Sequence, residues 1–135
     1  MKLFPISISL LVVALVSGCS SESGSSAAKG NPPTISNLSF ETQSIPVGKV
    51  ETVKGSVDFD DADGDFDAIE GELVFASQKQ TIPRYPATTN GQKKGTLQLL
   101  FQLGAAQAGT ADIQLWGVDK NGNKSNVEKI SLEAK

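Results

Sequence analysis

The sequence predicts a small all-β sandwich of about seven strands. Apolar and polar residues alternate in several short runs after position 33, and turn-forming residues separate these runs at regular spacing. A helical period of 3.6 residues is absent over any useful length. The chain has 135 residues, which is room for one folded domain.

The first three predicted strands span residues 34–40, 50–59 and 68–76. Asn31-Pro32-Pro33 precedes them and favours an extended entry, because proline disfavours helix in the residue before it. The step from Ile35 to Leu38 breaks a strict two-residue period. The residues expected to face the core are Ile35, Leu38 and Phe40, then Val53, Val57 and Phe59, then Ile69, Leu73 and Phe75.

The last four predicted strands span residues 81–85, 96–103, 110–118 and 127–132. Pro83 assigns the first of them to a sheet edge, because proline cannot donate a ladder hydrogen bond. The third alternates cleanly, so one face is expected to be buried. The inward face of the third strand is either that of Ala111, Ile113 and Leu115 or that of Trp116 and Val118. The last strand is expected to close the domain through Val127, Ile130 and Leu132.

The N-terminus has the residue pattern of a secretory signal peptide. Lys2 precedes the apolar run Leu10–Val16, which is too short to span a bilayer but fits the central part of a secretory signal peptide. The run Val16-Ser17-Gly18-Cys19 then resembles the lipobox of bacterial lipoproteins. The resemblance implies cleavage after residue 18 and acylation of Cys19, the chain's one cysteine. An uncleaved anchor, or an ordinary signal peptide with a coincidental cysteine, is the alternative.

The domain organisation follows from these signals. Residues 1–18 are predicted to be the signal peptide, 19–30 the lipidated cysteine with a flexible Ser/Gly-rich linker, and 31–135 the folded domain. Position two of the mature chain is Ser20, which in lipoproteins of Gram-negative enteric type looks like sorting to the outer membrane. We therefore expect the protein in the cell envelope, facing either the periplasm or the cell surface.

Three segments of the domain resemble bacterial immunoglobulin-like modules of the PKD, cadherin-like and fibronectin III groups. They are the opening NPPTISNLSF, the middle SVDFDDADGD and the end AGTADIQLWGVDKNGNKSN. The resemblance implies an antiparallel immunoglobulin-like sandwich. Ala111 stands where these families often have a tyrosine, so the tyrosine corner is absent.

The most unusual segment is DFDDADGDFD, residues 58–67, which contains six of the eight aspartates of the chain. In the immunoglobulin strand order, this turn lies at the same end as the 119–123 loop and the start of the first strand. Eight oxygen-bearing side chains could therefore converge. The candidate metal ligands are Asp60, Asp61, Asp63, Asp65, Asp67, Asp119, Asn121 and Asn123.

The acidic turn is open to two interpretations. Calcium takes six to eight oxygen ligands and accepts carboxylates and amides from flexible loops. An EF-hand is rejected, because Phe66 would occupy the position where that loop needs glycine. Alternatively, Asp and Gly build turns for backbone reasons, and the segment is a solvated acidic turn.

Composition excludes several functions. The lysines form no basic stripe and the net charge is −3, so no nucleic-acid partner is expected. The chain has no histidine, so no serine or threonine has the usual general base, and no enzyme is predicted. We expect a non-enzymatic binding or scaffolding module whose partners are the membrane and another envelope protein or a polysaccharide.

Two related functions remain as alternatives. One is carbohydrate binding, in which Trp116 or Tyr85 would stack on a sugar ring and would have to be exposed. The other is an accessory subunit of a secretion, pilus or adhesin complex, which an apolar patch on an edge strand would favour.

Overall fold

A computed structural model describes residues 30–135. Cys19, the predicted signal peptide and most of the predicted linker lie outside the described residues. The described part contains eight strands and no helix, and therefore no helix that could cross a bilayer. The strands are β1 (Thr34–Phe40), β2 (Ser44–Ile45), β3 (Val50–Asp60), β4 (Phe66–Phe75), β5 (Gln78–Pro86), β6 (Lys94–Gly104), β7 (Gly109–Asp119) and β8 (Lys124–Ala134).

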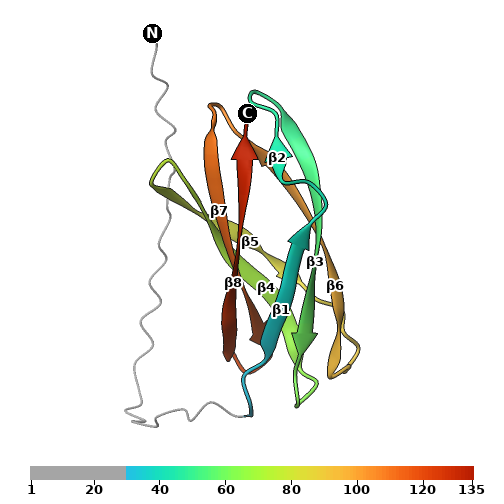
Figure 1. The fold of residues 1–135 in the computed structure, drawn as a ribbon. Helices are drawn as coiled ribbons and strands as arrows, with labels where there is room; N and C mark the ends of the chain where they lie inside the picture. The colour runs from blue at the N-terminus through green and yellow to red at the C-terminus, as the bar shows by residue number, and fades with distance from the viewer. Residues whose placement is uncertain (1–29) are drawn as a thin grey trace, which may run out of the picture.

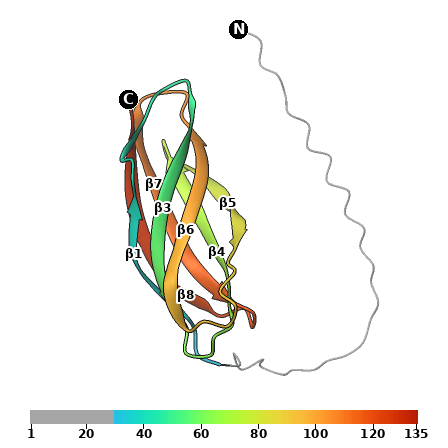
Figure 2. The same cartoon turned by 90° about the vertical axis from the view of Figure 1, so that its right-hand side faces the viewer.

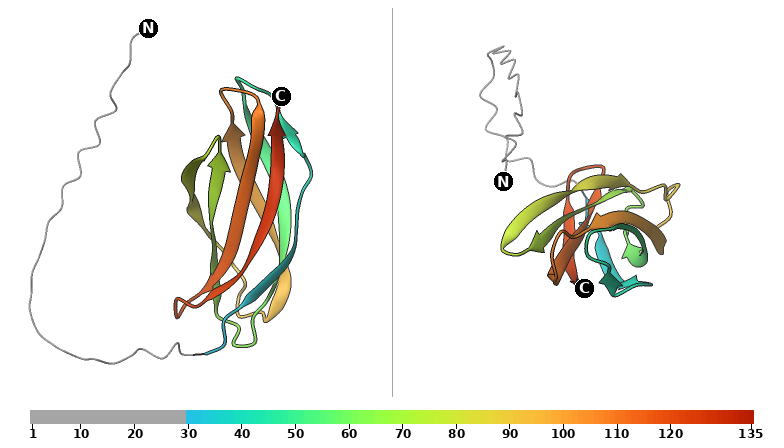
Figure 3. Two further views of the ribbon diagram at one scale, coloured as in Figure 1. Left: turned by 60° about the vertical axis from the view of Figure 1, so that its left-hand side comes forward. Right: turned by 90° about the horizontal axis from the view of Figure 1, so that it is seen from above.

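The strands form two packed sheets (Figure 1; Figure 3, seen from above). One sheet has the order β1-β3-β6, and the other has the order β2-β8-β7-β4-β5. Neighbouring strands are antiparallel except β2 and β8, which run parallel. The predicted all-β sandwich is confirmed, with one strand more than the seven expected.

The core lies between the two sheets, as the alternation predicted. Val57, Leu115 and Leu132 have no solvent exposure, and the rings of Phe59 and Phe66 stack at a centroid distance of 5.0 Å. Val127 is the exception. It is 47% exposed because it lies opposite Trp116 on the outer face of the larger sheet.

Among residues 30–135, the buried hydrophobic cluster runs from Ile35 to Ala134, and Pro33 is also buried. Burial of this apolar surface is the dominant favourable term in folding. Residues 30–135 therefore contain a core that draws on both sheets and are expected to fold as an independent unit.

Two irregularities were not predicted in detail. Asn37 has φ of 55°, and the register between β1 and β3 shifts between Ser36 and Ser39. This β-bulge places two residues of β1 opposite one of β3, which explains the broken period between Ile35 and Leu38. The two-residue strand β2 is too short to show any alternation.

One side of the sandwich is closed by a side chain. Asn126 of β8 accepts a hydrogen bond from the Ile35 backbone N–H at 2.9 Å and donates one to the Ile35 carbonyl at 2.8 Å. The amide thus takes the place of a neighbouring strand and links β1 in one sheet to β8 in the other.

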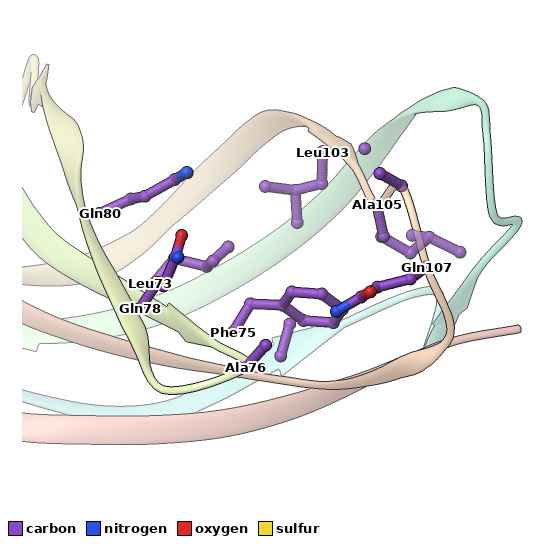
Figure 4. Close-up of a pocket in the computed structure, with 12 residues that line it drawn as sticks. Leu73, Phe75, Ala76, Gln78, Gln80, Leu103, Ala105 and Gln107 are labelled. Atoms are coloured by element: carbon purple, nitrogen blue, oxygen red, sulfur yellow. The ribbon is translucent and has the colours of Figure 1, made fainter. Parts of the chain in front are cut away.

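The opposite side is open, between the edge strands β5 and β6, which lie at the edges of different sheets (Figure 2). Two adjoining cavities of about 360 and 390 Å³ lie there, which we call the β5–β6 groove. Leu103 of β6 faces Leu73 and Phe75 of β4 across the first of them (Figure 4).

Candidate metal centre

Three chain segments meet at the end of the sandwich where the described chain begins, the lower end in Figure 1. The Lys120 backbone N–H donates to the Asp65 carbonyl at 3.0 Å, and the Asn121 side-chain amide donates to Asp65 Oδ2 at 2.7 Å. The Asn31 backbone N–H donates to Asp63 Oδ2 at 2.6 Å. The acidic turn, the 119–123 turn and the start of the domain therefore form one end surface.

Asp61 organises the acidic turn. Its carboxylate is fully buried and accepts the backbone N–H groups of Asp63 and Asp65, each at 3.1 Å. Its own N–H donates to the Lys93 carbonyl at 2.7 Å, which ties the turn to the loop between β5 and β6. Aspartate is favoured in such turns because its short side chain reaches backbone amides two residues on.

Asp61, Asp63 and Asp65 form a compact carboxylate triad. One oxygen from each lies within 4.8 Å of the other two, a spacing that could hold a metal ion. Asp65 Oδ1 is buried, and within residues 30–135 it has no hydrogen-bond partner. Burial raises the pKa of Asp65 above its usual value, and the negative charges of Asp119, Asp61 and Asp63 raise it further.

Two of the predicted ligands point to cations of the protein itself. Asp60 forms an ion pair with Lys94 at 3.0 Å, directly across the β3–β6 ladder. Asp67 pairs with Arg84, which also contacts Glu70 at 2.9 Å. These two carboxylates flank the triad and are already charge-compensated.

The remaining predicted ligands build the 119–123 turn. Asp119 is buried, and its Oδ1 accepts the backbone N–H groups of Asn121 and Asn123, each at 2.8 Å. The Asn123 side-chain amide donates to Asp119 Oδ2 at 2.7 Å. Asn121 reaches across to the triad, through Asp65.

Sequence reasoning did not place the loop between β5 and β6 at this end. A Cβ on Gly64 would lie 2.8 Å from the Gly91 carbonyl oxygen, and Gly64 has φ of 70°. Glycine at this position therefore lets the acidic turn pack against that loop. The sequence predicted a turn at Asn90-Gly91, but which segment packs against that turn depends on the strand order of the sheets.

The two aromatic residues considered for sugar binding are half-buried. Trp116 lies on the outer face of the larger sheet, where its Nε1 donates to Glu70 at 3.3 Å and Lys124 Nζ lies 5.1 Å from its ring centroid. Tyr85 lines the β5–β6 groove and packs near Phe101, with ring centroids 6.4 Å apart. Both rings already have protein partners.

Solved structures similar to this chain include the PKD domain of an M14-like peptidase from Thermoplasmatales archaeon SCGC AB-540-F20. It is 15% identical, with a TM-score of 0.50, over 78% of this chain and 97% of that one. A Niemann-Pick type C2 protein from Japanese carpenter ant is 14% identical, with a TM-score of 0.51, over 78% of this chain and 95% of that one.

Neither a scan against protein-family models nor a search of curated proteins found a match. At these identities the likeness to solved structures concerns the fold. The chain has an immunoglobulin-type sandwich fold, as the sequence predicted. Because this fold serves many unrelated functions, the function has to be argued from the site.

Proposed function

We propose that the protein is a non-enzymatic binding or scaffolding module of the cell envelope, lipid-anchored at Cys19 and stabilised by calcium at its acidic end. The observation that carries the metal proposal is the buried Asp65 Oδ1, which lacks a partner among residues 30–135. Leaving a buried acceptor unpaired costs about 1–3 kcal/mol. A cation in the carboxylate triad would supply the missing partner.

Calcium suits this site better than magnesium. Calcium accepts six to eight oxygen ligands in irregular geometry, whereas magnesium demands a near-ideal octahedron and gives up its waters reluctantly. The three carboxylates of the triad belong to one turn, and Asp63 is exposed to solvent. Three carboxylates would supply the charge, and water or backbone carbonyls would complete the coordination.

A bound calcium ion would also fix how the domain leaves its membrane tether. Asp63 already holds the Asn31 backbone N–H, the second residue of the described chain. A Cβ on Gly30 would clash with Asp63 Oδ2, so the chain passes very close to the triad. Ordering Asp63 around a cation would therefore order the point where the predicted linker enters the domain.

The test is thermal unfolding of residues 30–135 in EDTA and in millimolar calcium. We expect calcium to raise the Tm, since a ligand at about a hundred times its Kd stabilises by about 2.7 kcal/mol. Asp65→Asn should abolish the rise. Asp112→Asn is the matched control, because Asp112 hydrogen-bonds Ser131 on the larger sheet and should leave the rise intact. Equal melting in both buffers would refute the calcium site.

The lipid anchor is tested separately. Cys19→Ser removes the thiol that the lipobox resemblance implies is acylated, so the full-length chain should lose its lipid and its cleavage after residue 18. Mass spectrometry of the mature N-terminus and fractionation of membranes measure both effects. Recovery of an acylated wild-type N-terminus would support the envelope location. An unmodified Cys19 in the membrane fraction would contradict the lipid anchor and would favour an uncleaved membrane anchor. The expected partner is an envelope protein or a polysaccharide.

A further inference from the structure

Strand β6 is the outer strand of the smaller sheet, and one of its edges is free. It pairs with β3 without a bulge, from Lys94 opposite Asp60 to Gly104 opposite Val50. Within residues 30–135, no backbone hydrogen bond from any segment other than β3 reaches this strand. Eleven regular residues therefore present a row of unpaired N–H and C=O groups.

The other edge strands carry features that discourage pairing with another chain. Strand β5 contains Pro83, which lacks a backbone N–H, between the charged Lys79 and Arg84. Strand β1 has a bulge and is held by Asn126, and β2 has only two residues. In β6, residues 95–104 contain neither proline nor charge, so this edge is open to a further strand.

The outer face of β6 is complementary to itself. Leu100 is 54% exposed at its centre, and Gln98 and Gln102 flank it symmetrically. If a second β6 runs antiparallel with Leu100 opposite the partner's Leu100, each Gln98 meets the partner's Gln102. Residues 95–111 carry no charge, so this pairing opposes no like charges.

The inner face of β6 matches in the same register. There, Leu97 would lie opposite the partner's Leu103, and Leu99 opposite the partner's Phe101. Leu97, Phe101 and Leu103 are half-buried in the monomer, and the last two line the β5–β6 groove. Pairing would extend this apolar lining into the second copy and cover part of its exposed surface.

We propose that the protein forms a two-fold symmetric dimer in which β6 of each copy pairs antiparallel with β6 of the other, centred on Leu100. The two three-stranded sheets then become one continuous sheet. Such an interface is isologous, so the free donors and acceptors of one strand match those of its copy. The dimer does not depend on the calcium site or on the lipid anchor.

The oligomeric state of residues 30–135 tests the proposal by size-exclusion chromatography with light scattering across the micromolar range. We expect a dimer for the wild type. Leu100→Lys places two like charges directly opposite each other and should give a folded monomer, with a Tm that no longer depends on protein concentration. Val127→Lys is the matched control, because it also replaces an exposed apolar residue but lies on the larger sheet, and it should stay dimeric.

A cysteine scan tests the register. Directly opposed residues of an antiparallel pair have Cα atoms about 4.5–5.5 Å apart, within the range that a disulfide bridges. Residues 30–135 contain no cysteine, so Leu100→Cys should form a covalent dimer on oxidation. Gln102→Cys should not, because it faces the partner's Gln98. A wild-type monomer, a dimer that survives Leu100→Lys, or equal cross-linking of the two cysteine variants would overturn the proposal.

Discussion

At the scale of single residues, Asp65 determines the chemistry of the acidic end. Its Oδ2 has a good donor in Asn121, whereas its Oδ1 is buried without a partner among residues 30–135. Three other aspartates surround it, and their charges disfavour its ionisation. The ionised carboxylate is therefore destabilised in the folded protein, and either a proton or a cation relieves it.

Because the ionised Asp65 is destabilised, the stability of the metal-free protein should depend on pH. The folded protein binds the Asp65 proton more tightly than the unfolded chain does, because the folded-state pKa is raised above 3.8. The free energy of unfolding should therefore rise as pH falls from neutral through the folded-state pKa. Below pH 3.8 the contribution of Asp65 no longer increases. In that range Asp58 acts in the opposite direction, because hydrogen bonds from Thr96 and Asn37 lower its pKa and its stabilising contribution is lost as pH falls.

The variant Asp65→Asn isolates this effect. An amide keeps an acceptor for Asn121 and offers donors to the neighbouring carboxylates, so the variant should be more stable than the metal-free wild type. Its advantage should be largest at neutral pH and should shrink as pH falls. Urea unfolding of both proteins at several pH values measures the difference. If the difference in free energy of unfolding between the two proteins stayed constant with pH, the pKa of Asp65 would not be raised in the folded protein.

The sequence predicted which residues lie at the acidic end, but not which side chains form ion pairs there. The strand order implied that the acidic turn and the 119–123 turn meet, and the contacts of Asp65 show that they do. That Asp60 pairs with Lys94 and Asp67 with Arg84 depends on strand register and edge order. Neither quantity is encoded in the local alternation of the sequence.

At the scale of elements, alternation and turn residues predicted seven strands, and each is present within a few residues of its expected bounds. Strand β2 was not predicted, because two residues are too few to show an alternation of apolar and polar side chains. It pairs parallel with the C-terminal end of β8, which is a tertiary contact. The role of Asn126 was not predicted either, because it also depends on a tertiary contact: its partner Ile35 lies 91 residues away in the sequence.

The link between β1 and β8 predicts a stability effect. Asn126→Ala would leave the N–H and C=O of the buried Ile35 without their partners, which should cost about 1–3 kcal/mol. Ser131→Ala is the control, because it removes an exposed hydrogen bond to Asp112 and should change stability by less than about 0.5 kcal/mol. Urea unfolding measures both variants. Equal losses would mean that Asn126 does not close the sandwich.

At the scale of the whole molecule, the described chain begins at the acidic end and the C-terminus lies at the other end (Figure 1). A strand of eleven residues is about 36 Å long, which sets the length of the sandwich. In an antiparallel β6 dimer, the acidic end of one copy lies beside the C-terminal end of the other. The two predicted linkers therefore leave the dimer from opposite ends.

This arrangement predicts how a lipid-anchored dimer lies on a membrane. Eleven Cα–Cα steps lead from Cys19 to Gly30, which corresponds to a root-mean-square length of about 17–20 Å for a flexible linker. An upright dimer would have to stretch one linker over about 36 Å, near the limit of an extended chain. A dimer lying along the membrane lets both linkers stay relaxed, so we expect it to lie flat.

Neutron reflectometry of the lipid-anchored protein on a supported bilayer measures the thickness of the protein layer. Leu100→Lys, as an upright or freely tilting monomer on one linker, should give a thicker layer than the wild type. Val127→Lys should match the wild type. Equal thickness for all three would contradict the flat dimer even if the β6 interface exists in solution, because it would mean that the linkers do not constrain the pair. A thinner layer for the wild type would support a dimer that pairs through β6 and lies flat on the membrane, with both linkers relaxed.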